Sequence, residues 1–471
     1  MARRSRNFEL KSVDVIDIDA KGRGVVKHED KVIFVPETCP GDTISLRTFK
    51  KKKNYFEGKL LELETKSNDR VEPICAHYDD CGGCKLQHIS YEKQLELKEK
   101  QVFDAITRIA KVPYQEFLPI LGCDETERYR NKLEFSASNK RWITKAESAS
   151  EQSYPEENGL GFHIAGRFDK ILHIEKCHFQ PEPSNAIRNF VYSYAKKNDI
   201  AFYDIREHQG QLRSVLIRNN EEGDFMVAIM VTSQGMNFAK GVLAALKTEF
   251  PQIKSGLVIE NNKVNDTIYD LKPEVVFGEA YITQNIFGLE FEVDAKSFMQ
   301  TNSRQTLKLY SLAGEFAELK GDEVVYDLFC GVGTIGMCLS NSCKEVIGIE
   351  TVPEAIVKAN KNAKHNQIEN IRFETGSVEH VMTEEFRTKY PAPDVVITDP
   401  PRMGMHQKVV DMLLEMAPKK IVYVSCNPST QARDIALLAE KYELIKVRPV
   451  DMFPHTPHIE SVALLKLKVE D

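Results

Sequence analysis

A short segment near the carboxyl end of the chain has the residue types of a nucleophilic site. The β-prone run 420–425 leads directly into Cys426, and Pro428 then stops the strand. The amphipathic stretch that begins at Ser429 predicts a helix with this serine as its N-cap. Cys426 should therefore lie beside a helix N-terminus, whose partial positive charge favours a thiolate. A buried structural cysteine is the alternative for a single residue of this type.

The elements that position this cysteine form a regular alternation. From about residue 296, strand-like runs at 323–328, 345–350, 394–398 and 420–425 alternate with helical stretches. This order predicts a parallel, doubly wound α/β sheet of the Rossmann-like kind. Such open sheets bind ligands in the crevice at the carboxyl ends of their strands. Cys426 follows the last of these four strands and is expected to face that crevice.

A glycine-rich turn follows the first strand of this sheet. Residues 331–336 satisfy G-x-G-x-x-G, and Glu350 ends the next strand, as a ribose hydroxyl acceptor should. The pattern fits a nicotinamide-dependent dehydrogenase, a methyltransferase that uses S-adenosylmethionine, or any Rossmann-like crossover. Two acidic residues favour the methyl donor: Asp327, four residues before the first glycine, and Asp399, which opens an Asp-Pro-Pro-Arg corner.

A second candidate for proton chemistry lies near the end of the chain. Glu460 stands at the start of the final predicted strand, two residues after His458, and prolines at 454 and 457 restrict the segment before it. A lone glutamate at a strand end is usually solvated. Paired with Cys426 across the crevice, Glu460 becomes a candidate general base.

Three cysteines early in the chain have the spacing of metal ligands. Cys75, Cys81 and Cys84 form C-x5-C-x2-C in a turn-rich segment, and Cys177 is the best candidate for a fourth ligand. Four cysteines can hold a tetrahedral zinc ion or an iron–sulfur cluster, and the spacing does not distinguish the two.

The amino-terminal residues differ in composition from the rest of the chain. Residues 1–65 contain short alternating strands separated by glycine and proline turns, which predicts a small OB-like β-barrel. Residues 1–60 hold 14 Lys and Arg against 9 Asp and Glu, a local charge of +5 in a chain of net charge −7. Four lysines at 50–53, followed by Tyr55 and Phe56, indicate an RNA-binding surface, although a solvated hairpin tip would look similar.

Between these regions we expect a central domain of mixed α+β structure over residues 66–290, which includes the four cysteines. Within it, residues 91–111 have helical periodicity, with Leu95, Val102, Ile106 and Ile109 on one side, and this helix could pack on the catalytic domain at 291–471.

The composition narrows the class of protein. The chain has 471 residues, is 42% hydrophobic, and contains no apolar run long enough to span a membrane. Its amino end lacks the apolar core of a secretory signal, so we expect a soluble cytoplasmic protein. Ten cysteines in a reducing compartment indicate metal binding or catalysis rather than a disulfide framework.

With these motifs assembled, the chain resembles the RNA (uracil-5-)-methyltransferases over essentially its whole length. The resemblance is to the iron–sulfur branch of the family that carries a TRAM domain, an OB-like RNA-binding module, and modifies 23S ribosomal RNA. It rests on the cysteine spacing, the glycine turn and four further motifs. These are Phe298-Met-Gln300-Thr-Asn302, Asp399-Pro-Pro-Arg402, Ser425-Cys426-Asn-Pro428 and His458-Ile-Glu460.

The resemblance implies specific roles. Cys426 would be the nucleophile and Glu460 the base for removal of the uracil C5 proton. S-adenosylmethionine and a four-iron, four-sulfur ([4Fe–4S]) cluster would be the cofactors, and the enzyme would act as a monomer on RNA. Transfer RNA, or two ribosomal sites, are alternative targets, and a non-catalytic RNA-binding protein is a distant alternative. The S-adenosylmethionine contacts would come from Gln300, Phe329, Gly331, Gly333, Glu350 and Asp399, and the cluster ligands would be Cys75, Cys81, Cys84 and Cys177.

Overall fold

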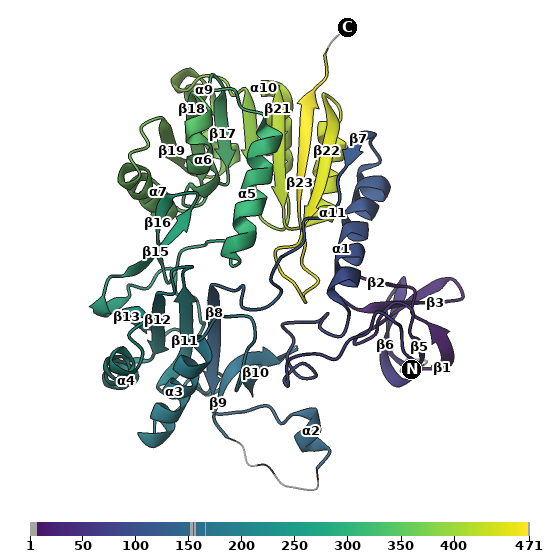
Figure 1. The fold of residues 1–471 in the computed structure, drawn as a ribbon, viewed down its shortest axis with the longest axis vertical. Helices are drawn as coiled ribbons and strands as arrows, with labels where there is room; N and C mark the ends of the chain where they lie inside the picture. The colour runs from purple at the N-terminus through teal and green to yellow at the C-terminus, as the bar shows by residue number, and fades with distance from the viewer. Residues whose placement is uncertain (1–6, 151–153, 155–156, 165, 470–471) are drawn as a thin grey trace, which may run out of the picture.

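The computed structural model describes residues 7–150, 154, 157–164 and 166–469 (Figure 1). Residues 1–6 of the predicted first domain and 470–471 of the predicted third lie outside this range. Figure 1 shows an eight-stranded sheet at the top, a seven-stranded sheet below it, and a smaller sheet beside the second, with helix α1 leading from the small sheet to the large one.

The first sheet has the strand order β1-β5-β6-β4-β3-β2. Its edge strands β1 and β2 are consecutive in the chain and are separated only by Val15 and Ile16, so the sheet must curl until its two edges approach. Strand β3 begins after the turn that follows β2. The strands are β1 (Glu9–Asp14), β2 (Asp17–Ile18), β3 (Gly24–His28), β4 (Lys31–Val35), β5 (Thr43–Lys51) and β6 (Tyr55–Thr65).

The following residues 66–90, here called the cysteine segment, form turns and lead into helix α1 (Tyr91–Ala105), where the Ser90 side chain accepts from the Lys93 N–H. The helix continues as a π-turn, η1 (Ile106–Ala110). A π-turn adds a residue to the turn and shifts the buried face. Ala110 is therefore buried, and Ile109, expected on the buried side, is 44% exposed.

Helix α1 packs on the carboxyl-terminal sheet rather than on the central one. Val102 and Ile106 belong to the same hydrophobic core as the strands of that sheet. Strand β7 (Tyr114–Phe117), which follows the helix, pairs in parallel with β22 (Tyr442–Val450) at the edge of the sheet. The packing expected of helix 91–111 is thus present, and it extends to a strand that the sequence did not reveal.

The central sheet has the order β10-β9-β8-β11-β12-β13-β14 and carries helices α3 and α4 on one face (Figure 1). This is the expected mixed α+β arrangement. Its elements are β8 (Lys132–Ser138), α2 (Lys145–Ser148), β9 (Gly159–Ile164), β10 (Arg167–His173), α3 (Ser184–Lys197), β11 (Leu212–Asn219), β12 (Phe225–Val231), η2 (Ser233–Gly235), α4 (Met236–Glu249), β13 (Ile253–Glu260) and β14 (Glu274–Gly278).

A hairpin follows, β15 (Tyr281–Ile286) with β16 (Leu289–Asp294), and crosses the domain boundary predicted at 290/291. Phe291 and Val293 pack in the core of the carboxyl-terminal unit, so the hairpin associates with that unit.

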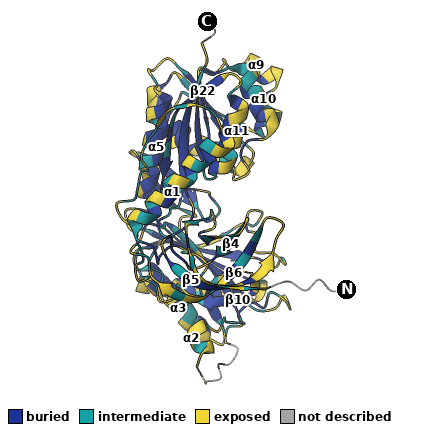
Figure 2. Cartoon of the chain, turned by 90° about the vertical axis from the view of Figure 1, so that its right-hand side faces the viewer, coloured by how far each residue is buried: buried dark blue, intermediate teal, exposed yellow. Residues whose placement is uncertain are grey.

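The large sheet has the order β19-β18-β17-β20-β21-β23-β22-β7. Its four predicted strands are present within one residue of their expected bounds, and β23 is antiparallel to both neighbours. Helices cover both faces and bury the strands between them (Figure 2). The elements are α5 (Ser303–Ala317), β17 (Val324–Leu328), α6 (Thr334–Leu339), η3 (Ser340–Ser342), β18 (Glu345–Glu350), α7 (Pro353–His365), β19 (Ile371–Thr375), α8 (Val378–Val381), α9 (Glu384–Lys389), β20 (Val395–Thr398), α10 (Gln407–Met416), β21 (Lys420–Ser425), α11 (Pro428–Leu438) and β23 (Glu460–Leu467).

The chain order of the strands reverses between β17 and β20, which makes this point the topological switch of the sheet. Ligands of open α/β sheets bind at such a point, outside the carboxyl ends of the strands. In the part of the chain that the structure describes, no helix combines the length and the apolar character needed to cross a membrane.

Candidate active site

Cys426 occupies the turn between β21 and α11, as expected, but the helix cap differs from the prediction. Asn427 is the N-cap, and its side chain accepts from the Ser429 N–H at 3.2 Å. Pro428 takes the first helical position, where a missing N–H costs nothing. Cys426 therefore stands just outside the first turn of α11 and is half-buried.

The register of the sheet brings Glu460 to the same end of the sheet as this cysteine. The antiparallel pairing of β21 with β23 ends with Ser425 facing Ser461. Cys426 directly follows Ser425 and Glu460 directly precedes Ser461, and the charge of Glu460 contributes to the shift in the pKa of Cys426. Glu460 is 4% exposed. The predicted nucleophile and the predicted base thus lie near each other at the end of this strand pairing, although 33 residues separate them in the chain.

The Asp399 corner closes the site from the neighbouring strand. The Asp399 N–H donates to the Leu328 carbonyl, which holds the corner at the end of β17. The Arg402 carbonyl accepts from Asn427 Nδ2 at 2.9 Å and from Thr430 Oγ1 at 3.3 Å. These bonds fix the corner against the turn that carries Cys426.

The charges of the crevice oppose ionisation of the thiol. Burial raises the pKa of Cys426 to about 11, with further contributions from Glu460 and Asp399, while Arg402 lowers it. The thiolate expected from the helix N-terminus is therefore not favoured in the free protein, because desolvation and two carboxylates outweigh the helix dipole. Burial likewise raises the pKa of Asp399 to about 7 and the pKa of Glu460 well above its ordinary value.

The glycine turn after β17 has the shape of a cofactor cradle. Gly331 has φ 56°, and no atom lies within 4 Å of the position that a Cβ would occupy there. The Gly331 N–H donates to Glu350 Oε2 at 3.0 Å, so the turn and the acidic end of β18 are joined. At Gly333, also in the left-handed region, a Cβ would clash with Phe373. Asp327 supports the turn by accepting from the Gly336 N–H at 2.9 Å.

Of the other two predicted cofactor contacts, Phe329 lies two residues before this turn and Gln300 lies in the segment before α5. Phe329 has φ 64°, a left-handed conformation that is costly for a bulky residue and is concentrated at functional sites. Gln300 is 7% exposed, and its carbonyl accepts from Asn131 Nδ2 at 3.0 Å. Asn131 precedes β8, so this bond joins the central sheet to the segment before α5.

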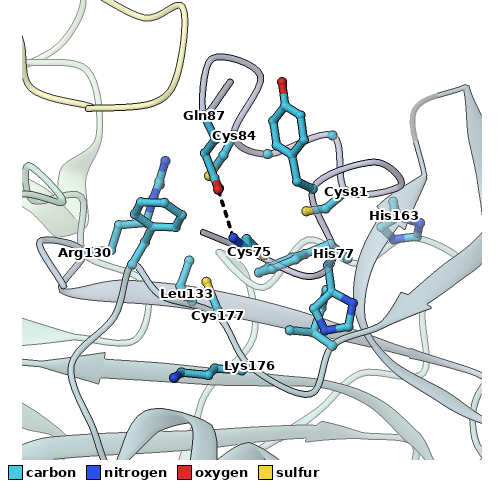
Figure 3. Close-up of a pocket in the computed structure, with 16 residues that line it drawn as sticks. Cys75, His77, Cys81, Cys84, Gln87, Arg130, Leu133, His163, Lys176 and Cys177 are labelled. Carbon is cyan, nitrogen blue, oxygen red and sulfur yellow. Dashed lines mark hydrogen bonds between the residues drawn. The ribbon is translucent and has the colours of Figure 1, made fainter. Parts of the chain in front are cut away.

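The four predicted metal ligands line a single cavity of about 380 Å³ (Figure 3). Burial raises the pKa of each thiol, to about 11 for Cys81 and about 12 for Cys84. Backbone N–H groups of the turns act in the opposite direction on Cys75, Cys81 and Cys177, as expected where sulfur accepts hydrogen bonds. Among the described residues, no three His, Cys, Asp or Glu side chains are close enough to hold a metal ion.

Two further residues of the crevice were contained in the motifs but had received no role. Arg402 Nη2 lies 3.4 Å from His458 Nδ1, so the Asp399 corner and the segment before Glu460 meet above the site. The sequence feature that could have indicated a role for Arg402 is its positive charge at the end of the Asp-Pro-Pro-Arg corner. Among the residues that shift the pKa of Cys426, Arg402 is the only cation.

Comparison with known proteins shows the family to which the chain belongs. A family model described as tRNA (Uracil-5-)-methyltransferase matches residues 269–468. A protein of Bacteroides thetaiotaomicron, described as an uncharacterized RNA methyltransferase, is 48% identical over 95% of this chain and 100% of its own length. A protein of Porphyromonas gingivalis with the same description is 46% identical over 97% of this chain and 100% of its own. The chain belongs to the RNA (uracil-5-)-methyltransferase family.

A solved relative supports the same assignment for the fold and the methyl donor. It is the Pyrococcus abyssi tRNA (uracil-54, C5)-methyltransferase in complex with S-adenosyl-L-homocysteine, which superimposes with a TM-score of 0.76 at 28% identity and covers 97% of this chain and 100% of its own. As a member of this family, the protein is an RNA methyltransferase that uses S-adenosylmethionine. The matched range 269–468 contains all the predicted catalytic and cofactor residues, whereas the four cysteines lie outside it.

Proposed function

We propose that this RNA (uracil-5-)-methyltransferase methylates uracil C5 through a covalent bond between Cys426 and uracil C6. The observation that supports the proposal is that β21 and β23 end their pairing at Ser425 and Ser461, next to Cys426 and Glu460, and that the charges of Glu460 and Asp399 act on the Cys426 thiol. Uracil C5 is a weak nucleophile, and addition of a thiolate at C6 places negative charge on C5.

The residues then have distinct tasks. Cys426 loses its proton to solvent water, and its sulfur adds to C6 while the C5=C6 electrons move onto C5 and the O4 oxygen. S-adenosylmethionine, when bound, supplies the methyl group that C5 takes. Glu460, ionised at this stage, removes the C5 proton, the C5=C6 double bond re-forms, and Cys426 is expelled as thiolate. Arg402 is the group that favours the thiolate form.

The four cysteines of the cavity are proposed to hold a cluster, by the likeness of the chain to the iron–sulfur branch of the family. Zinc–sulfur bonds of about 2.3 Å bring four thiolates within contact of one another. Here four thiols line a cavity of about 380 Å³. A [4Fe–4S] cluster is itself several atoms wide and accepts four cysteine ligands. We assign Cys75, Cys81, Cys84 and Cys177 to it, with a role in folding and in shaping the RNA-binding surface.

The curled first sheet is proposed to be the TRAM-type, OB-like barrel that holds RNA. Cationic and aromatic side chains adjoin on it: Arg23 stacks on Phe34 at 4.4 Å, and Lys31 lies 5.2 Å from the Phe56 ring. The target base must leave its stack to reach Cys426. By its likeness to the iron–sulfur branch, 23S ribosomal RNA is the first candidate substrate. Transfer RNA is the second, favoured by the P. abyssi relative that methylates tRNA uracil-54.

Two experiments test these assignments. Replacing Cys426 with Ala should abolish methyl transfer while S-adenosylmethionine binding stays within a few-fold. Cys343→Ala, which removes a buried thiol remote from the crevice, is the matched control and should retain activity. Mass mapping of methyluridine in ribosomal and transfer RNA after gene deletion identifies the substrate. If the deletion strain retains every methyluridine in both RNAs, the proposal is contradicted.

A further inference from the structure

The segment that carries Glu460 into the crevice is held from outside the catalytic sheet. Residues 451–459, here called the Glu460 loop, connect β22 to β23. Asp451, Met452 and Thr456 in this loop are at most 1% exposed. Because the loop ends directly at Glu460, its position fixes where the carboxyl group enters the crevice.

Gln94 of helix α1 binds the middle of this loop through both ends of its amide. Its Oε1 accepts from the His455 N–H at 2.8 Å, and its Nε2 lies 3.2 Å from His455 Nδ1. His455 has φ 65°, a conformation that is unfavourable for a residue with a side chain and persists only where its surroundings hold it. Gln94 supplies part of that restraint, and its own side chain is fully buried.

The same amide joins the loop to the cysteine segment. Gln94 Nε2 also donates to the Leu86 carbonyl at 3.1 Å and to the Ile89 carbonyl at 2.8 Å. The Leu86 N–H in turn donates to the His455 carbonyl at 2.9 Å. Leu86 is two residues from Cys84, so the turn with the cysteines is bonded directly to the loop that ends at Glu460.

A buried charge pair holds the beginning of the loop. Lys98 Nζ donates to Asp451 Oδ1 at 2.7 Å and to the Phe453 carbonyl at 3.0 Å, and both charged side chains are at most 1% exposed. Tyr91 donates to the other Asp451 oxygen at 2.9 Å. Three residues on one face of α1, namely 91, 94 and 98, therefore contact the loop over two helical turns.

We propose that Gln94 and Lys98 are positioning residues for Glu460: they hold the Glu460 loop so that its carboxyl group reaches the C5 proton. The inference rests on the proposed role of Glu460 as base. The proposed positioning role affects only one of two stages of the reaction. Thiol addition and methyl uptake depend on Cys426, which these residues do not touch, whereas release of methylated RNA depends on the position of Glu460.

The test is the Gln94→Met variant, which keeps the length of the side chain and removes its hydrogen bonds. The full-length protein is given S-adenosylmethionine with a radiolabelled methyl group and total RNA from a strain that lacks the gene. Methyl transfer in a single turnover, turnover with RNA in excess, and the fraction of labelled RNA in a denaturant-resistant adduct are measured.

Gln94→Met should retain single-turnover methyl transfer within about threefold, lose turnover by roughly 10- to 100-fold, and accumulate methylated RNA in the adduct, since a misplacement of about 1 Å can cost 10²-fold. Tyr442→Phe is the control: it removes a buried hydrogen bond to the Pro418 carbonyl at the remote end of β22, and it should accumulate no adduct. Equal adduct levels in the two variants would overturn the inference.

Two further variants keep the outcomes distinct. Glu460→Gln should accumulate the same adduct; if it does so while Gln94→Met does not, the positioning role is wrong and the proposed base stands. If Glu460→Gln accumulates none, the proposed base is wrong and the inference is overturned with it. If Gln94→Met fails to fold, the substitute is Tyr91→Phe, which removes the hydroxyl that donates to Asp451 at the beginning of the Glu460 loop. This variant must show the adduct for the inference to hold.

Discussion

Lys98 and Asp451 form an almost fully buried ion pair although 353 positions separate them in the sequence. One comes from the helix that follows the cysteine segment and the other from the end of β22. The pair therefore joins the amino-terminal half of the chain to the loop that delivers Glu460. A buried pair of this kind is costly to break, because the remaining partner is left as an uncompensated charge.

Lys98→Met should lower the free energy of unfolding by about 3–5 kcal/mol, since it leaves the Asp451 carboxylate buried without its cation. Urea denaturation followed by circular dichroism measures the loss. Lys361→Met is the matched control, because the Lys361–Glu292 pair is exposed on the lysine side and should change stability by about 0–1 kcal/mol. Similar losses in the two variants would show that the buried pair contributes no more to the free energy of unfolding than the exposed pair.

The reactivity of Cys426 should rise steeply with pH in the free protein. With the thiol pKa raised to about 11, the thiolate fraction at pH 7 is roughly 10⁻⁴, and it grows about tenfold per pH unit. Alkylation by iodoacetamide, followed by mass spectrometry of the Cys426 peptide, should increase from pH 7 to pH 9 without a plateau. Arg402→Gln should slow it at each pH, because Arg402 lowers the pKa. A plateau near pH 7 would mean a depressed thiol pKa and would contradict this account.

Binding of S-adenosylmethionine should tighten as the pH rises from 6 to 8. Burial raises the pKa of Asp327 and of Asp399 to about 7, so both carboxyl groups are partly protonated at neutral pH. A bound sulfonium cation favours their ionised forms, and ionisation is more complete at higher pH. Titration calorimetry measures the affinity. S-adenosylhomocysteine, which lacks the sulfonium charge, is the control and should depend less on pH; an equal dependence for both ligands would argue against this placement of charge.

Anaerobic purification should give a brown protein with about four iron and four sulfide per chain, as four cysteine ligands around one [4Fe–4S] cluster require. Elemental analysis and visible absorbance measure this. Cys177→Ser should lose most of the iron, whereas Cys39→Ser, a buried cysteine outside the cavity, should keep it. A colourless protein with bound zinc would show that the four cysteines hold a structural zinc ion instead of a cluster. A folded, cluster-free Cys81→Ser variant with full activity would exclude a role in shaping the RNA-binding surface.

Much of the catalytic sheet could be predicted from local sequence. The strands that end at Leu328, Glu350, Thr398 and Ser425 agree with the prediction within a residue. Their hydrophobic runs are bounded by turn residues, and a strand buried on both faces needs little more than that to be recognised. The glycine turn at 331–336 was also readable, because its geometry depends on residues that are adjacent in the chain.

Other features required the tertiary structure. Lys98 interrupts the apolar face of α1. The sequence around it gives no indication that Asp451 is its partner. Strand β7 was missed because its pairing with β22 is remote in sequence. In each case the deciding contact joins segments that are far apart along the chain.

By itself the sequence determined which residues could act: a cysteine after a strand, a glutamate before another, a glycine turn and four spaced cysteines. Only the tertiary structure decided that Cys426 lies near Glu460, because their proximity depends on the register of β21 with β23. It also reversed the expected ionisation of the thiol. The helix dipole is a local property that sequence reveals, whereas burial and the charges of Asp399 and Glu460 come from segments that folding brings together.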